Sequence, residues 1–121
     1  MALKVTSAEK RPGVITISPI GSMDTNTYMI LEEKVDSILQ KTPDLIIFDM
    51  ENLNYINSMG IRVLLKTKKA QKKWDGKVVF MNLQPQIKKV FDILKALPSL
   101  QVFASIEELD NYLDAMQKKA R

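Results

Sequence analysis

Two short, uninterrupted apolar runs, and a third stretch in which Gln101 stands among apolar residues, constrain the fold more than any other feature of this chain. They occupy residues 45–48, 78–81 and 100–103. A continuous apolar run of this length is typical of a strand that is covered on both faces of a sheet. The stretches between the runs have the length and apolar spacing of helices, which the crossovers between parallel strands require. The pattern therefore predicts an α/β fold with a mostly parallel sheet.

The N-terminal part of the sequence predicts a β-hairpin ahead of this alternation. Two apolar stretches, residues 3–7 and 14–18, flank a turn that contains Pro12 and Gly13. The complete expected order of elements is ββαβαβαβα, with a helix after each of the last four strands. A chain of 121 residues is the usual size of one domain, so we expect a single domain that spans residues 1–121.

The segment around Ser58 predicts a helix whose N-terminus is capped. We expect residues 50–56 to form a short connection and the helix to begin near Ser58, with Asn57 as its N-cap. Gly60 lowers helix propensity, which indicates that the helix approaches the sheet closely at this point. Free backbone N–H groups at this end of the helix would favour an anion on Ser58. On the spacing alone, a plain capping role for Asn57 and Ser58 is the more economical interpretation.

The composition argues against several functional classes. The chain contains no cysteine and no histidine, so it lacks a thiolate nucleophile, the commonest general base and the commonest transition-metal ligand. Asp49 and Glu51 follow a predicted strand, but no second catalytic group or glycine-rich phosphate loop accompanies them. We therefore expect no catalytic residues, no metal and no cofactor. Neither a signal peptide nor a membrane span is recognisable, and a cytoplasmic location is the simplest expectation.

Four segments, in order and at the family's spacing, resemble the STAS domains, and among them the bacterial anti-sigma factor antagonists. Each segment alone is a weak signal, whereas the ordered set covers nearly the whole chain. The segments are "IGSMD" at 20–24, "LIIFDMENLNYINSMGIRVLL" at 45–65, "DGKVVFMNLQPQIKKVFDIL" at 75–94 and "FASIEELDNYL" at 103–113. The resemblance implies the STAS fold, a mixed and mostly parallel sheet with an N-terminal hairpin.

The resemblance also implies a regulatory, protein-binding function. Proteins of this kind bind an anti-sigma factor, usually a serine protein kinase, and so release a sigma factor. The kinase phosphorylates a serine at the start of a helix, and a PP2C-type phosphatase reverses this. By position that serine is Ser58, with Asn57, Met59, Gly60 and Asp24 as partner-binding residues. Asn57 and Met59 depart from the family pattern, which usually has Asp before the serine and Ser or Thr after it.

Other functions stay open on the sequence alone. Within the same fold, one is an interaction or scaffold module that is not phosphorylated, and another is a partner of a membrane-transport system. A remoter alternative is nucleic-acid binding through the basic face between Lys66 and Lys77, where Trp74 would stack on a base. The more economical interpretation of the basic face is a solvated surface. The more economical interpretation of Asp24 is a helix cap. A weak homodimer also stays open.

Overall fold

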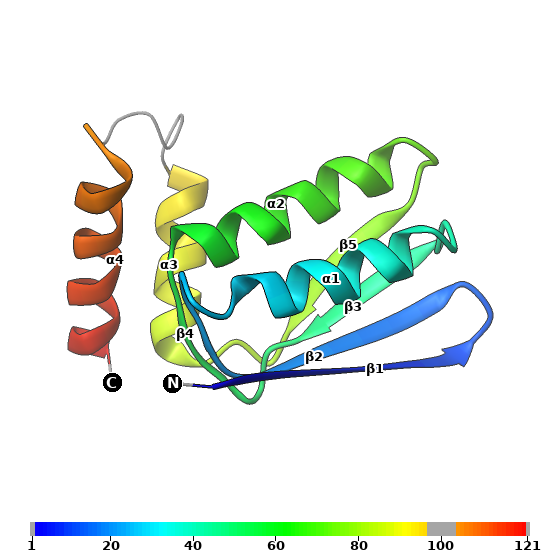
Figure 1. The fold of residues 1–121 in the computed structure, drawn as a ribbon, viewed down its shortest axis with the longest axis horizontal. Helices are drawn as coiled ribbons and strands as arrows, with labels where there is room; N and C mark the ends of the chain where they lie inside the picture. The colour runs from blue at the N-terminus through cyan, green and yellow to red at the C-terminus, as the bar shows by residue number, and fades with distance from the viewer. Residues whose placement is uncertain (1, 97–103, 121) are drawn as a thin grey trace.

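In the described part of the chain, residues 2–96 and 104–120 of a computed structural model, five strands form one mixed sheet. In chain order the elements are β1 (Leu3–Arg11), β2 (Val14–Met23), α1 (Tyr28–Leu39), β3 (Leu45–Asp49), β4 (Leu53–Ile56), α2 (Ser58–Lys72), β5 (Lys77–Met81), α3 (Pro85–Ala96) and α4 (Ile106–Ala120). Helices α1 and α2 lie across one face of the sheet, and α3 and α4 stand side by side at its end (Figure 1).

The sheet begins with the expected antiparallel hairpin and continues with parallel strands. β1 pairs antiparallel with β2, β2 pairs parallel with β3, and β3 pairs parallel with β5. β4 pairs parallel with the second half of β2 and lies off this path. At the hairpin turn Gly13 has a φ of 79°, a conformation that glycine adopts at little steric cost. The α/β class, the mostly parallel sheet and the N-terminal hairpin are therefore confirmed.

Strand β4 is a difference from the expected order of elements. The sequence predicts a short connection over residues 50–56, whereas Leu53–Ile56 forms a strand. The reason lies in β2, which has ten residues and pairs with β3 only over its first part. The backbone groups of its second part need partners, and Gly21, Ser22 and Met23 find them in β4. The expected strand at residues 100–103 lies outside the described residues, so the observed order is ββαββαβαα.

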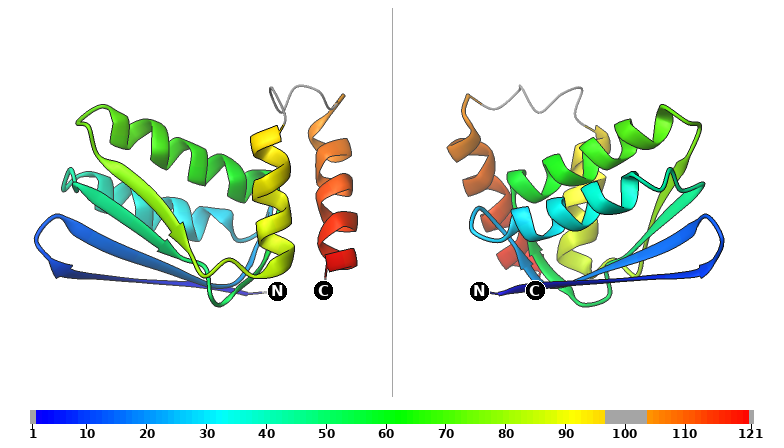
Figure 2. Two further views of the ribbon diagram at one scale, coloured as in Figure 1. Left: turned by 180° about the vertical axis from the view of Figure 1, so that it is seen from behind. Right: turned by 45° about the vertical axis from the view of Figure 1, so that its right-hand side comes forward.

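The central strands are covered on one face only, which corrects the expectation from their uninterrupted apolar runs. In β3, Ile46 and Phe48 are fully buried, whereas Leu45 and Ile47 on the opposite face are half-buried. Both views in Figure 2 show α1 and α2 on the same side of the sheet. Within the ranges 2–96 and 104–120, no helix lies over the other side. The run in β3 therefore reflects β-propensity as well as burial.

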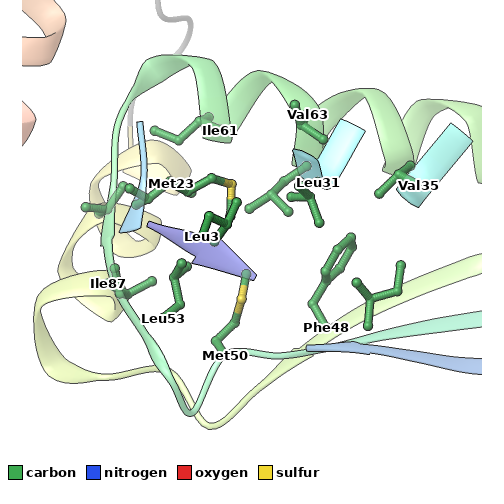
Figure 3. Packing of buried hydrophobic residues seen from close by; sticks show 14 of the residues in the cluster. Leu3, Met23, Leu31, Val35, Phe48, Met50, Leu53, Ile61, Val63 and Ile87 are labelled. Carbon is green, nitrogen blue, oxygen red and sulfur yellow. The ribbon is translucent and has the colours of Figure 1, made fainter. Parts of the chain in front are cut away.

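The core fills the space between the sheet and the helices. Figure 3 shows buried side chains from seven of the elements and from the β3–β4 turn: Leu3, Met23, Leu31, Val35, Phe48, Met50, Leu53, Ile61, Val63 and Ile87. Helix α1 contributes Leu31, Val35 and Ile38, which are its buried residues. Burial of one such side chain contributes about 1.5–3 kcal/mol, so this layer holds α1 and α2 firmly against the sheet.

Candidate functional site

Asn57 caps helix α2, as the sequence predicts. Its backbone is extended, and its side-chain Oδ1 accepts from the backbone N–H groups of Met59 at 3.0 Å and of Gly60 at 3.3 Å. Its side-chain Nδ2 donates to Thr25 Oγ1 at 3.1 Å. Two of the N–H groups that a helix start leaves unpaired are thereby satisfied. The same residue ties the start of α2 to the loop between β2 and α1.

Ser58 is the first residue of α2 and is buried, with 2% of its surface exposed. Its backbone N–H donates to Oδ1 of Asp110 on α4 at 2.8 Å. Its hydroxyl Oγ is buried, and the described residues offer it no hydrogen-bond partner. A carboxylate of α4 therefore already occupies the position in which the helix dipole and free N–H groups favour an anion.

A second polar residue of α4 binds the strand that leads into Ser58. The side-chain amide of Gln117 accepts from the N–H of Ile56 at 2.9 Å and donates to the carbonyl of Ile56 at 2.7 Å. It also donates to the carbonyl of Leu113 at 3.1 Å, and it is fully buried. Gln117 thus pairs both backbone groups of Ile56, as a neighbouring strand would.

Sequence reasoning missed Asp110 and Gln117 as members of this site. They bind residues that lie 52 and 61 positions earlier in the chain. A signal for Gln117 was present, because it lies four residues after Leu113 on the apolar face of α4. A polar residue at a core-facing position needs a hydrogen-bond partner. Nothing in the spacing shows that this partner is β4.

Carboxylates surround Tyr55, the residue of β4 that lies three positions before Ser58. Burial, which is the largest cause, acts together with the charge and hydrogen bond of Asp114 and the charges of Asp110 and Asp24 to raise the pKa of the Tyr55 hydroxyl to about 12. These carboxylates come from α4 and from the loop before α1. The start of α2 therefore combines a positive helix end with an acidic rim.

Asp24 shapes the loop before α1, but it is not the cap of that helix. The sequence favours Asp24 as a helix cap, whereas the N-cap is Thr27 and the helix begins at Tyr28. Asp24 Oδ1 accepts from the N–H of Asn26 at 2.9 Å and from the hydroxyl of Thr27 at 3.1 Å. This local turn uses the side chain that a cap would need. It also places Thr25 against Asn57.

Met59 and Gly60 face different surroundings. Gly60 is buried, and a Cβ atom there would lie 2.7 Å from Met23 Sδ and 2.9 Å from Ile56 Cγ1, so the predicted close approach of this helix to the sheet is confirmed. Met59 is half-buried and lines a groove between α1 and α2. The other lining residues of this groove are Tyr28, Glu32, Arg62, Val63 and Lys66. The accessible part of the site thus extends from Met59 along α2.

The basic face further along α2 has the character of a solvated surface. Lys66 binds Asp36 at 3.2 Å and Glu32 at 3.5 Å on α1. The hydrogen bond to Asp36 is the main reason why the pKa of Lys66 is raised. Trp74 is half-buried, and its indole Nε1 donates to the carbonyl of Pro43 at 3.0 Å. Its ring is therefore held by the fold.

Asp49 and Glu51 form the acidic pair near the end of β3, and the side chain of Asp49 stabilises the turn between them. Asp49 Oδ1 accepts from the backbone N–H of Glu51 at 3.2 Å and from the side-chain amide of Asn82 at 3.1 Å. These bonds close the turn after β3 against the end of β5.

Among the helices of the described ranges, none is both long and apolar enough to span a membrane.

Comparison with known proteins places this geometry in a family. A model of the STAS domain matches residues 6–109. A protein of Bordetella bronchiseptica named "Putative anti-sigma factor antagonist BtrV" is 27% identical over 85 residues, which are 70% of this chain and 73% of that protein.

Solved structures share the fold at lower identity. The anti-sigma factor antagonist SpoIIAA of Bacillus, in its unphosphorylated form, has a TM-score of 0.64 at 20% identity, covering 74% of this chain and 83% of that chain. An anti-sigma factor antagonist from Mycobacterium paratuberculosis has a TM-score of 0.67 at 19% identity, covering 98% of this chain and 94% of that chain. Because the STAS model matches most of the sequence and the fold agrees, this chain belongs to the STAS domain family.

Proposed function

We propose that this STAS domain is an anti-sigma factor antagonist, which binds an anti-sigma factor of the serine-kinase type in the cytoplasm and so releases a sigma factor. Ser58 is its phosphorylation site, and a PP2C-type phosphatase removes the phosphate. The observation that carries the proposal is the position of Ser58 as the first residue of a capped helix. Similarity to BtrV, and to SpoIIAA, whose structures include a phosphorylated form, supports it.

The partner surface that we propose surrounds the start of α2. On α2, Met59 presents an apolar group and Arg62 a cationic one. Thr25 of the loop adds a hydroxyl, and Met29 in the first turn of α1 adds a second apolar side chain. Met29 is 41% exposed, which is high for a large apolar side chain. Methionine adapts its shape to a partner, and both methionine and arginine are enriched in protein interfaces.

A phosphate on Ser58 would change the charge of this surface strongly. It adds about −1.5 to −2 charges at neutral pH, beside the carboxylates of Asp24 and Asp110. At an interface this charge repels acidic partner groups and must lose its hydration. The core residues Ile46 and Phe48 of β3 and Leu31 and Val35 of α1 take no part in this site. The modification therefore acts on binding while the rest of the fold is kept.

One observation favours a second candidate, a constitutive interaction module that is not phosphorylated. The Ser58 side chain is buried in the conformation described above. A kinase needs the hydroxyl exposed. If α4 stays in place at all times, the same surface would bind its partner without this form of control.

Mass spectrometry of the peptide that carries Ser58 distinguishes the two candidates. The protein is isolated from its own cells during growth and under stress. We expect phosphate on Ser58 in one of these states and its loss in another. Absence of phosphate in all of them would overturn the regulated function and leave the constitutive module.

A direct titration tests the partner surface. The anti-sigma factor is identified among proteins that copurify with this chain, and its Kd is then measured with purified components. We expect Arg62→Glu to raise Kd by at least about tenfold, as central interface residues do. Lys69→Glu, an equal charge change at an exposed position further along α2, is the matched control. Equal affinities for both variants would contradict this surface.

A further inference from the structure

We propose that α4 is a latch over Ser58: while α4 is docked, Ser58 is closed to a kinase, and a phosphate on Ser58 keeps α4 undocked. The latch consists of the contacts that Asp110 and Gln117 make with Ser58 and Ile56. The first half of the proposal concerns the unmodified protein alone. The second half rests on the proposed function, because it requires phosphate at Ser58.

Asp110 and a phosphate on Ser58 need the same place. Both are anions that bind the free N–H groups of a helix N-terminus, and Asp110 already accepts from the N–H of Ser58 itself. The Ser58 hydroxyl is buried and has no partner in the part of the chain that the structure describes. Space for phosphate oxygens at this atom therefore appears only when the covering groups move.

Electrostatic repulsion then keeps the latch open. The phosphate adds about −1.5 to −2 charges, and Asp110 and Asp114 of α4 carry negative charge toward the same region around Tyr55. Redocking of α4 would bring these carboxylates against the phosphate in a buried, weakly screened place. Phosphorylation and docking of α4 therefore exclude each other.

Release of α4 leaves most of the core in place. Helix α4 packs mainly on α3 and on the start of α2, and both views of Figure 2 place it at one end of the molecule. Ile46 and Phe48 of the sheet are covered by α1 and α2 instead, as Figure 3 shows for Phe48 with Leu31 and Val35. Local opening of such a peripheral element costs less than global unfolding.

A thiol placed at Ser58 measures the docked state without any kinase. The chain contains no cysteine, so Ser58→Cys gives a full-length protein with one thiol. Its rate of reaction with a small disulfide reagent reports how often the site is open. Ser7→Cys, at an exposed position of β1, gives the rate of a freely accessible thiol. We expect Ser58→Cys to react at least about tenfold more slowly than Ser7→Cys.

Removing the latch contacts should open the site. In the Ser58→Cys background, Asp110→Ala and Gln117→Ala should each raise the rate by about tenfold, as expected for loss of a buried or charged hydrogen bond. Glu107→Ala, which removes an exposed carboxylate from the same helix, should leave the rate unchanged. If Ser58→Cys reacts as fast as Ser7→Cys before any latch contact is removed, the proposal is overturned. Protection of the Ile46 amide against hydrogen exchange verifies that each variant is folded.

Phosphoserine incorporated genetically at position 58 tests the second half, again without a kinase. NMR follows the side-chain amide of Gln117, which is buried and donates to Ile56. We expect its exchange with solvent to accelerate by at least about tenfold, while the Ile46 amide stays protected. A Gln117 amide that stays protected beside phosphoserine would refute the latch, whatever kinase or partner the protein has. Absence of phosphate in cells would refute only the proposed function.

Discussion

At the start of α2 a single side chain has two roles. The Oδ1 atom of Asn57 binds the amides of Met59 and Gly60, and its Nδ2 atom holds Thr25 of the loop before α1. The first role fixes where the helix begins, and the second fixes where an accessible part of the proposed partner surface lies. Loss of this side chain therefore affects both the helix and the surface.

We predict that Asn57→Ala lowers the free energy of unfolding by about 1–2 kcal/mol, because two helix amides lose their acceptor. Urea denaturation measures this as a lower midpoint with an unchanged slope. Asn57→Asp keeps the acceptor oxygen and is the control, expected within about 0.5 kcal/mol of wild type. An alanine variant as stable as wild type would show that the cap contributes nothing.

The raised pKa of Tyr55 predicts how the stability of the protein changes at high pH. Its pKa is raised from 10.0 to about 12 in the folded protein, so the folded state keeps the phenol proton at a pH where the unfolded state loses it. This contribution is complete below pH 10 and is lost as pH rises toward about 12. The wild type should therefore lose stability relative to Tyr55→Phe across that window. Parallel denaturation curves for the two proteins at every pH would contradict the raised pKa.

At the scale of elements, β4 depends on two neighbours that come from distant parts of the chain. On one side it pairs with the end of β2, and on the other the side chain of Gln117 binds Ile56. A strand of four residues has few hydrogen bonds of its own. Its order therefore depends on both β2 and α4.

Two adjacent amides allow a test with an internal control. The N–H of Ile56 donates to Gln117, whereas the N–H of Asn57 donates to the carbonyl of Met23 in β2 at 3.0 Å. We predict that Gln117→Ala accelerates hydrogen exchange at Ile56 by about tenfold or more and leaves Asn57 nearly unchanged. Equal acceleration at both amides would mean that the substitution loosens β4 as a whole.

Features that depend on nearby residues could be predicted from the sequence, and those that depend on distant ones could not. The cap at Asn57, the helix start at Ser58 and the close approach at Gly60 follow from residue types a few positions apart. The hairpin turn follows from Pro12 and Gly13 in the same way. These signals act through local backbone geometry, which neighbouring residues determine.

The errors have a common physical origin in tertiary pairing. Strand β4 exists because β2 extends beyond β3, and the length of a partner strand is not visible in residues 53–56. The contact of Asp110 with Ser58 depends on where α4 is placed relative to α2. The run in β3 has the pattern of a doubly covered strand, although only Ile46 and Phe48 are fully buried. Each case required the three-dimensional arrangement.

At the scale of the whole molecule, charge is distributed unevenly along α2. The net charge is +4, yet the start of α2 is surrounded by carboxylates of Asp24, Asp110 and Asp114. Lysines are exposed along the rest of the helix, and Lys66 is paired with α1. A charged partner therefore meets surfaces of opposite sign at the two ends of one helix.

Trp74 provides the test of nucleic-acid binding at this scale. It is the single tryptophan of the chain, and its hydrogen bond to Pro43 holds the ring in the fold. We predict that single-stranded DNA leaves the tryptophan fluorescence unchanged, because base stacking would require the ring to be free. Quenching that disappears at higher salt, and that Lys72→Glu weakens, would revive the nucleic-acid alternative.

The two residues that form the contact between Ser58 and Asp110 are also synthesised at different times. Asp110 is synthesised 52 residues after Ser58, and at a translation rate of about 5–20 residues per second this interval is roughly 3–10 s. During that interval β2, β4 and the start of α2 have already been made, while the helix that supplies Asp110 has not. Every newly made molecule therefore passes through a period in which the backbone N–H of Ser58 has no Asp110 to bind.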